Sequence, residues 1–134
     1  MKTYRTASLV LMILFAITGI LFLVSPDRPI AFFNDLSSSL FPGMPQSPAI
    51  GWNFYLILAA GYMYLVTVLA FLMFRHPENH HFPLLLAHGK LASSILSLAF
   101  FLVQAHYLIY MANFAVDGVI GIVVLLMYAR MRKA

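Results

Sequence analysis

Four apolar stretches dominate this sequence, and each is about as long as a bilayer crossing requires. A transmembrane helix needs about 20 predominantly apolar residues. Such stretches occupy residues 7–24, 50–74, 84–110 and 114–131. Hydrophobic residues make up 63% of the chain and charged residues 9%, a balance that a water-soluble domain of this size has too little interior to bury. The sequence therefore predicts one all-α integral membrane domain, residues 1–134, with four transmembrane helices in an antiparallel bundle.

Lys2 and Arg5 precede the first apolar stretch, as basic residues also do in secretory signals. The stretch is long for a signal core, however, and no A-x-A-like cleavage site follows it. We expect an uncleaved transmembrane helix that ends at Ser25-Pro26, because proline removes a backbone donor.

A short amphipathic helix is predicted at residues 28–40, in the first loop. Phe33, Leu36 and Leu40 fall at i, i+3 and i+7, and Asp27 precedes the helix as a candidate cap. This pattern is typical of a helix that lies in the membrane interface. The favoured interpretation is a connector on the membrane surface, and a lid over a lipid or quinone site is the alternative.

The segment 75–83 is polar and holds two prolines, which indicates a turn between antiparallel helices. His76, His80 and His81 surround Glu78 there. Zinc sites need fixed spacing and supporting hydrogen bonds, which so short a loop seldom provides. We expect a solvated loop and no metal site. The chain contains no cysteine, so thiolate chemistry is excluded.

The third and fourth stretches contain four polar residues that a lipid-facing helix would not carry, His88, Lys90, His106 and Asp117. Intramembrane charges are costly and usually face a bundle interior or an interface. Lys90 lies about two turns from the start of its predicted helix, so we expect its side chain to snorkel towards the headgroups. A buried ion pair or a substrate contact is the alternative.

His88 and His106 are 18 residues apart, which places them on the same face of one long helix, roughly 27 Å apart. Stacked histidines of this kind hold haems in membrane cytochromes. Because no histidine lies on another predicted span, no bound cofactor is predicted, and haem or quinone remain alternatives.

The length of the last apolar region demands a turn, which we place near residues 111–113 with Asn113 as a cap. His106 and Asp117 would then lie at nearly equal depth on adjacent helices. The resulting hypothesis is a hydrogen-bonded His106–Asp117 pair. Lys90 would be a poorer partner, because it would lie roughly 20 Å or more away along the helix axes.

Small residues form two stripes that favour close helix packing, and we expect them to serve as packing faces. They are Gly89, Ser93 and Ser97 in the third stretch, and Gly118 and Gly121 in the fourth.

Basic residues cluster at one side of the predicted bundle. That side receives Lys2, Arg5, Arg75, Arg130, Arg132 and Lys133, and the other side receives Arg28. By the positive-inside rule, both termini are cytoplasmic and the amphipathic loop is external. The net charge of +4 is thus explained by orientation, and no nucleic-acid binding is expected.

No nucleotide-binding loop, zinc-protease motif or activated nucleophile occurs in the sequence, so we expect no catalytic residues and no enzyme activity. The segments GILFLVSP (residues 19–26) and AAGYMYLVTVLA (residues 59–70) resemble those of small bacterial four-helix membrane proteins of the DoxX-like kind. This resemblance implies a bacterial inner-membrane protein linked to redox or quinone biology.

Two functions remain open at the level of sequence. The first is an accessory or structural subunit that packs by its small-residue stripes against other subunits of an inner-membrane complex, for example a respiratory one. The alternative is a homo-oligomer that binds or moves a lipid, quinone or small solute between its helices. In either case the expected partners are membrane lipids and other membrane subunits or further copies of the chain.

Overall fold

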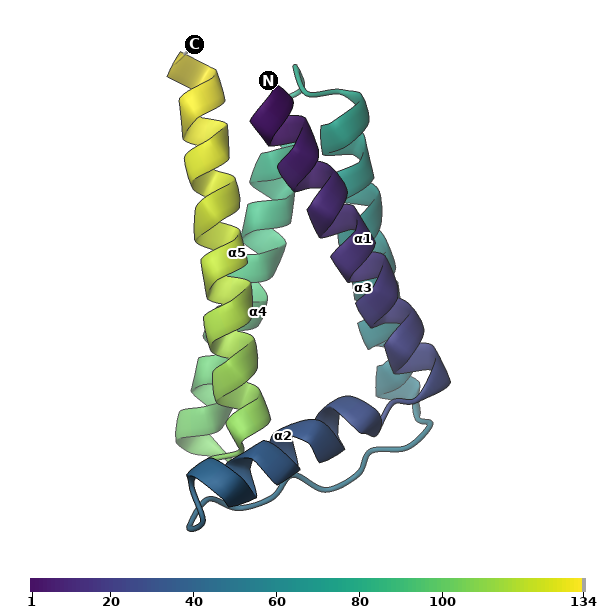
Figure 1. Ribbon diagram of the computed structural model, residues 1–134, viewed down its shortest axis with the longest axis vertical. Coiled ribbons are helices and arrows are strands. Elements are labelled where there is room, and N and C mark those ends of the chain that lie inside the picture. The colour runs from purple at the N-terminus through teal and green to yellow at the C-terminus, as the bar shows by residue number, and fades with distance from the viewer. Residues whose placement is uncertain (134) are drawn as a thin grey trace.

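The computed structural model describes residues 1–133, and all of its regular structure there is helical (Figure 1). Four of the helices are long and apolar enough to cross a membrane, which confirms the predicted fold class. The helices are α1 (Lys2–Val24), α2 (Arg28–Leu40), α3 (Phe54–Arg75), α4 (His81–Val103) and α5 (Leu108–Lys133).

Helix boundaries follow local chemistry at several ends. Helix α1 ends at Val24, directly before Ser25-Pro26, and α2 covers the residues predicted for the interfacial helix. Asn53 caps α3, since its side-chain oxygen accepts a hydrogen bond from the backbone N–H of Leu56. The second span therefore begins at Phe54, a few residues later than the apolar pattern indicated.

Asp27 precedes α2 but makes no side-chain capping bond, in contrast to the sequence-based expectation. Its Oδ1 atom accepts hydrogen bonds from the backbone N–H groups of Ile50 and Gly51 instead. Asn34 of α2 and Ser47 exchange two further hydrogen bonds. These bonds tie residues 41–53 to α2, so the two segments form one cover at that end of the bundle.

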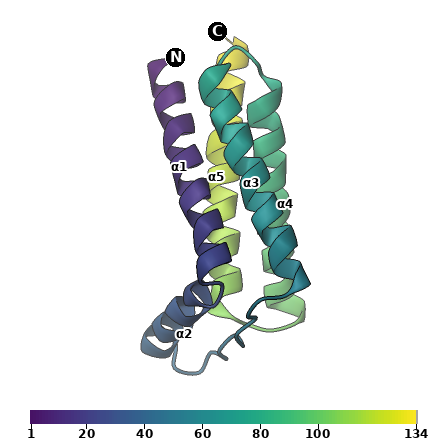
Figure 2. The ribbon, with the colours of Figure 1, turned by 90° about the vertical axis from the view of Figure 1, so that its right-hand side faces the viewer.

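The four long helices form two antiparallel pairs. Helix α1 packs along α3, α4 packs along α5, and α3 also contacts α4. Both termini and the α3–α4 loop lie at one end of the bundle, whereas α2 crosses the opposite end and contacts α5 (Figures 1 and 2). The two pairs lie closer together at the end with the termini and diverge towards α2 (Figure 1).

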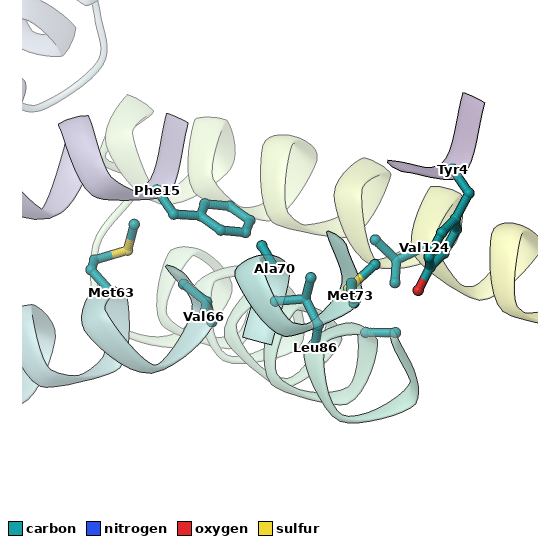
Figure 3. Packing of buried hydrophobic residues seen from close by; sticks show 9 residues of the cluster. Tyr4, Phe15, Met63, Val66, Ala70, Met73, Leu86 and Val124 are labelled. Carbon is teal, nitrogen blue, oxygen red and sulfur yellow. The ribbon is translucent and has the colours of Figure 1, made fainter. Parts of the chain in front are cut away.

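The buried apolar core follows this divergence. Tyr4, Met73, Leu86 and Val124 come from all four long helices and are buried near the end that holds the termini. Figure 3 shows these side chains in the space between the helices, with Phe15 further along α1. Packing therefore holds the helices together most tightly at the end of the bundle away from α2.

Large apolar side chains cover the outside of the bundle, as expected for helices that face lipid. They are exposed on every long helix and include Ile17, Ile20, Ile57, Leu58, Ile95, Leu96, Val119 and Ile122. Together with the four candidate spans, this surface describes a multi-pass membrane protein.

The turn between α4 and α5 lies at residues 104–107, so the predicted turn at residues 111–113 is wrong. Gln104 is the C-terminal cap of α4, and its backbone N–H donates to the Phe100 carbonyl. Asn113 lies within α5 and caps no helix. An α4 of 23 residues already suffices to cross the hydrocarbon core, which is why the chain turns before residue 110.

Candidate functional site

Lys90 and Asp117 form a buried ion pair between α4 and α5. The Lys90 ammonium donates a hydrogen bond of 2.9 Å to Asp117 Oδ1, and the two side chains are only 4% and 6% exposed. Two sequence-based expectations are therefore wrong. Lys90 does not snorkel towards the headgroups, and the partner of Asp117 is Lys90 and not His106.

The position of the turn explains this pairing. Lys90 lies 13 residues before the last residue of α4 and Asp117 lies nine residues after the first residue of α5, a difference of roughly 6 Å along the axes. The four-carbon stem of a lysine can span such an offset. Moving the turn by one residue lengthens one arm of the hairpin and shortens the other. Placing the turn about six residues too late in the sequence thus produced the predicted separation of roughly 20 Å between Lys90 and Asp117.

The pair lies deep within the candidate spans. Lys90 is nine residues from the start of α4, and Asp117 is nine residues from the start of α5, which enters from the opposite end. Each is therefore roughly 14 Å from a helix end, close to the middle of a hydrocarbon core about 30 Å thick. An isolated charge at that depth would be costly, and mutual pairing offsets part of the cost.

Two aromatic rings from the other helix pair complete the surroundings of the ammonium. Lys90 Nζ lies 4.6 Å from the ring centroid of Phe15 on α1 and 5.2 Å from that of Tyr62 on α3. Cations are attracted to the electron-rich faces of such rings within about 6 Å. Lys90 thus contacts α1, α3 and α5 and links the two helix pairs.

Asn113 extends the polar region towards α2. Its Nδ2 atom donates to the hydroxyl oxygens of Ser93, at 3.1 Å, and Ser97, at 2.6 Å. At the next residue of each helix, the Ser94 hydroxyl donates to the backbone carbonyl of Phe114. The serines of α4 therefore bond to α5 of the same chain.

The glycines of the two small-residue stripes also face other helices of the chain. Gly89 lies against the Tyr62 ring, and a Cβ atom at Gly121 would lie 2.7 Å from Leu91 Cγ. A side chain at Gly118 would meet the hydroxyl of Ser94. Both stripes are packing faces inside this chain.

A cavity of about 440 Å³ lies beside the ion pair, between α1, α3, α4 and α5. Its polar wall consists of Lys90, Asp117, Ser93, Asn113 and Tyr62, and the rest of its lining is predominantly apolar. The remaining lining residues are Leu14, Phe15, Thr18, Phe22, Ala59, Met63, Val116 and Ile120. Charged and amide groups are thus present in a cavity that is otherwise suited to hydrocarbon.

A second cavity of about 340 Å³ adjoins the first at the α2 end. Phe22, Ala59 and Asn113 line both cavities, so these residues mark their junction. Pro29 and Ile30 of α2 form part of the far wall. Together, the two cavities extend from the ion pair to the cover formed by α2. They lie where the two helix pairs diverge.

The histidines lie outside this site. His88 is exposed and its Nδ1 atom is 2.8 Å from the Leu84 carbonyl oxygen. His106 belongs to the turn after α4, where its ring meets that of Phe101 edge to face. The two histidines therefore do not share one helix, and the proposed stacked geometry is wrong. At the other end of the bundle, His76 Nδ1 lies 3.5 Å from Glu78 Oε1 in a loop.

Sequence reasoning selected Lys90 and Asp117 but did not connect Phe15, Tyr62 or Asn113 with them. Asn113 carried a usable signal, since its spacing of four residues from Asp117 places both on one helix face. Tyr62 also carried one, because a tyrosine hydroxyl deep in an apolar helix should find a partner inside the bundle or line a wet pocket. Phe15 carried none, because a phenylalanine in an apolar helix usually faces lipid or a packed core.

No family model, curated protein or solved structure matches this chain.

Proposed function

We propose that the bundle binds a small amphiphilic molecule of the lipid or quinone type between its helices. The observation that carries the proposal is the position of the Lys90–Asp117 pair in the wall of a cavity of about 440 Å³. The pair therefore places two charged groups where a molecule bound between the helices would meet them.

The dimensions and chemistry of the cavity support this proposal. Ligand sites typically measure about 300–1,000 Å³ and combine apolar walls with a few polar groups that orient the ligand. Here the polar groups are near the middle of the spans, and the apolar lining continues past Ala59 towards α2. A molecule with one polar end and a hydrocarbon body matches this distribution.

The accessory-subunit hypothesis rested on small-residue stripes that were free to contact a partner. Ser93 and Ser97 bond to Asn113, and Gly121 packs against Leu91, so these residues are already used within the chain. We therefore rank ligand binding first. The proposal also includes a bacterial-type inner membrane with cytoplasmic termini, and the DoxX-like resemblance of residues 19–26 and 59–70 links it to redox or quinone biology.

The proposal is tested by native mass spectrometry of the protein released from a mild detergent. Ala59 lines both cavities, so Ala59→Trp would fill their junction. Ile57→Trp is the matched control, because Ile57 lies on the same helix and is 67% exposed on the outer surface.

We expect the wild-type protein and Ile57→Trp to retain a bound small molecule that Ala59→Trp has lost. Retention of the same molecule by all three proteins would refute the site. Release of a further membrane protein and no small molecule from the wild type would favour the accessory-subunit hypothesis.

A further inference from the structure

The charges that line the two cavities sum to zero. Lys90 and Asp117 are the charged residues of the larger cavity, and the lining of the second contains none. Because these two side chains are hydrogen-bonded to each other at 2.9 Å, each charge is already compensated. A ligand that entered with its own charge would find no free counter-charge within the cavity walls.

An uncompensated charge is costly at this depth. Moving an ion from water into a low-dielectric interior costs several kcal/mol even after the surroundings relax. A cationic ligand could recover part of this cost by stacking on aromatic rings. The rings of Phe15 and Tyr62 already face the Lys90 ammonium, however, so they are not free to receive a second cation.

A neutral head group would find hydrogen-bonding partners in the cavity wall. The bond to Lys90 uses Asp117 Oδ1 and leaves Oδ2 as an acceptor, and Asn113 donates through Nδ2 and keeps its carbonyl oxygen. Ser93 accepts from Asn113 and retains its own hydroxyl hydrogen as a donor. These three residues line the larger cavity, so it offers both donors and acceptors to a head group.

We propose that the ligand is an amphiphile with an electrically neutral, hydrogen-bonding head group, such as a hydroxyl. The head group lies against Lys90, Asp117 and Asn113, and the apolar body extends past Phe22 and Ala59 towards α2. This inference rests on the proposed function and adds the charge class of the ligand.

The test uses photoreactive probes that share one diazirine-bearing alkyl chain and differ only in the head group. The heads are hydroxyl, sulfonate and trimethylammonium, because the latter two keep their charge and cannot be neutralised by proton transfer. Probe labelling of the purified protein in mild detergent is quantified by mass spectrometry of peptides from the cavity walls. Labelling that persists in Ala59→Trp is subtracted as labelling of the outer surface.

We expect the hydroxyl probe to label the cavity of the wild-type protein with at least about tenfold higher apparent affinity than either charged probe, equivalent to about 1.4 kcal/mol. This ranking requires no substitution in the ion pair. A charged probe that equals or exceeds the hydroxyl probe would overturn the inference and leave the proposed function intact. Absence of cavity labelling by all three probes would overturn both.

Probe labelling of charge-altering variants is a second, independent test of the inference. Asp117→Asn leaves the Lys90 charge without its partner, so the sulfonate probe should gain at least about tenfold relative to the hydroxyl probe. Lys90→Met should produce the corresponding gain for the trimethylammonium probe. Glu78→Gln is the control, since Glu78 lies in the α3–α4 loop outside both cavities, and it should leave the ranking unchanged. Folded variants with the wild-type ranking would contradict the charge argument.

Discussion

Lys90 and Asp117 carry opposite charges near the middle of two membrane-spanning helices, and each is the hydrogen-bonded partner of the other. The energetic consequence is asymmetric. Removing one partner leaves the other buried charge uncompensated, whereas removing both together leaves no buried charge at this position. The pair therefore matters more to the charge state of the cavity than to the net stability of the bundle.

A double-mutant cycle measures this asymmetry. We expect Lys90→Met and Asp117→Leu each to lower the free energy of unfolding in detergent by about 3 kcal/mol or more. The double variant should lie much closer to the wild type, so the coupling energy should be several kcal/mol.

The matched cycle combines His106→Ala with Asp117→Leu. His106 lies in the α4–α5 turn and has no hydrogen bond to Asp117. These two substitutions should be additive within about 0.5 kcal/mol, as independent sites are. Additivity of the Lys90 and Asp117 substitutions, or strong coupling of His106 to Asp117, would contradict the pairing.

At the scale of elements, close contact between α4 and α5 depends on glycine where one helix meets side chains of the other. A Cβ atom at Gly121 would lie 2.7 Å from Leu91 Cγ and 3.4 Å from the Ala87 carbonyl oxygen. Gly61, in α3, has no such neighbours within 4 Å. The same substitution can therefore be compared at Gly121, where neighbouring atoms are close, and at Gly61, where they are not.

We expect Gly121→Val to destabilise the protein by about 1–3 kcal/mol, because the added methyl groups must displace Leu91. Gly61→Val should change stability by no more than about 0.5 kcal/mol. Denaturation in mild detergent, followed by circular dichroism, measures both. Equal effects at the two positions would show that α4 and α5 are not packed as closely as described.

The elements were largely predictable from the sequence, but their register was not. The helices depend on local features of the sequence, and they are present as expected. These features are the long apolar stretches, Ser25-Pro26 and the amphipathic pattern at 28–40. The turn at residues 104–107 contains no glycine or proline, although polar Gln104 and His106 interrupt the apolar run there. Moving the turn by one residue changes the offset between facing residues of the two helices by two residues. The misplaced turn therefore assigned Asp117 the wrong partner.

The cavity could not be predicted for a different reason. Phe15 and Tyr62 reach Lys90 because the α1–α3 pair lies against the α4–α5 pair. Periodicity indicates which face of a helix is apolar but does not specify which other helix covers it.

At the scale of the whole molecule, both termini and the α3–α4 loop share one end, and α2 covers the other (Figure 1). The positive-inside rule then predicts that the end with the termini is cytoplasmic, since Lys2, Arg5 and Arg75 lie there with the basic C-terminal residues.

Single cysteines test this orientation, because the chain contains none of its own. A cysteine in place of Ser38, in α2, or Gln46, in the following segment, should react with a membrane-impermeant reagent added to intact cells. A cysteine in place of Asn79, in the α3–α4 loop, should react only after the membrane is permeabilised. Labelling of position 79 in intact cells would reverse the orientation.

If the cavity beside Lys90 and Asp117 receives an amphiphile, the thermal stability of the protein must depend on that ligand. A ligand that binds only the folded state at about 100 times its Kd stabilises it by about 2.7 kcal/mol. We therefore expect a hydroxyl-headed amphiphile to raise the melting temperature of the wild-type protein and of Ile57→Trp in detergent, with saturation, and to leave that of Ala59→Trp unchanged. No rise in the wild type, or the same rise in Ala59→Trp, would contradict the account.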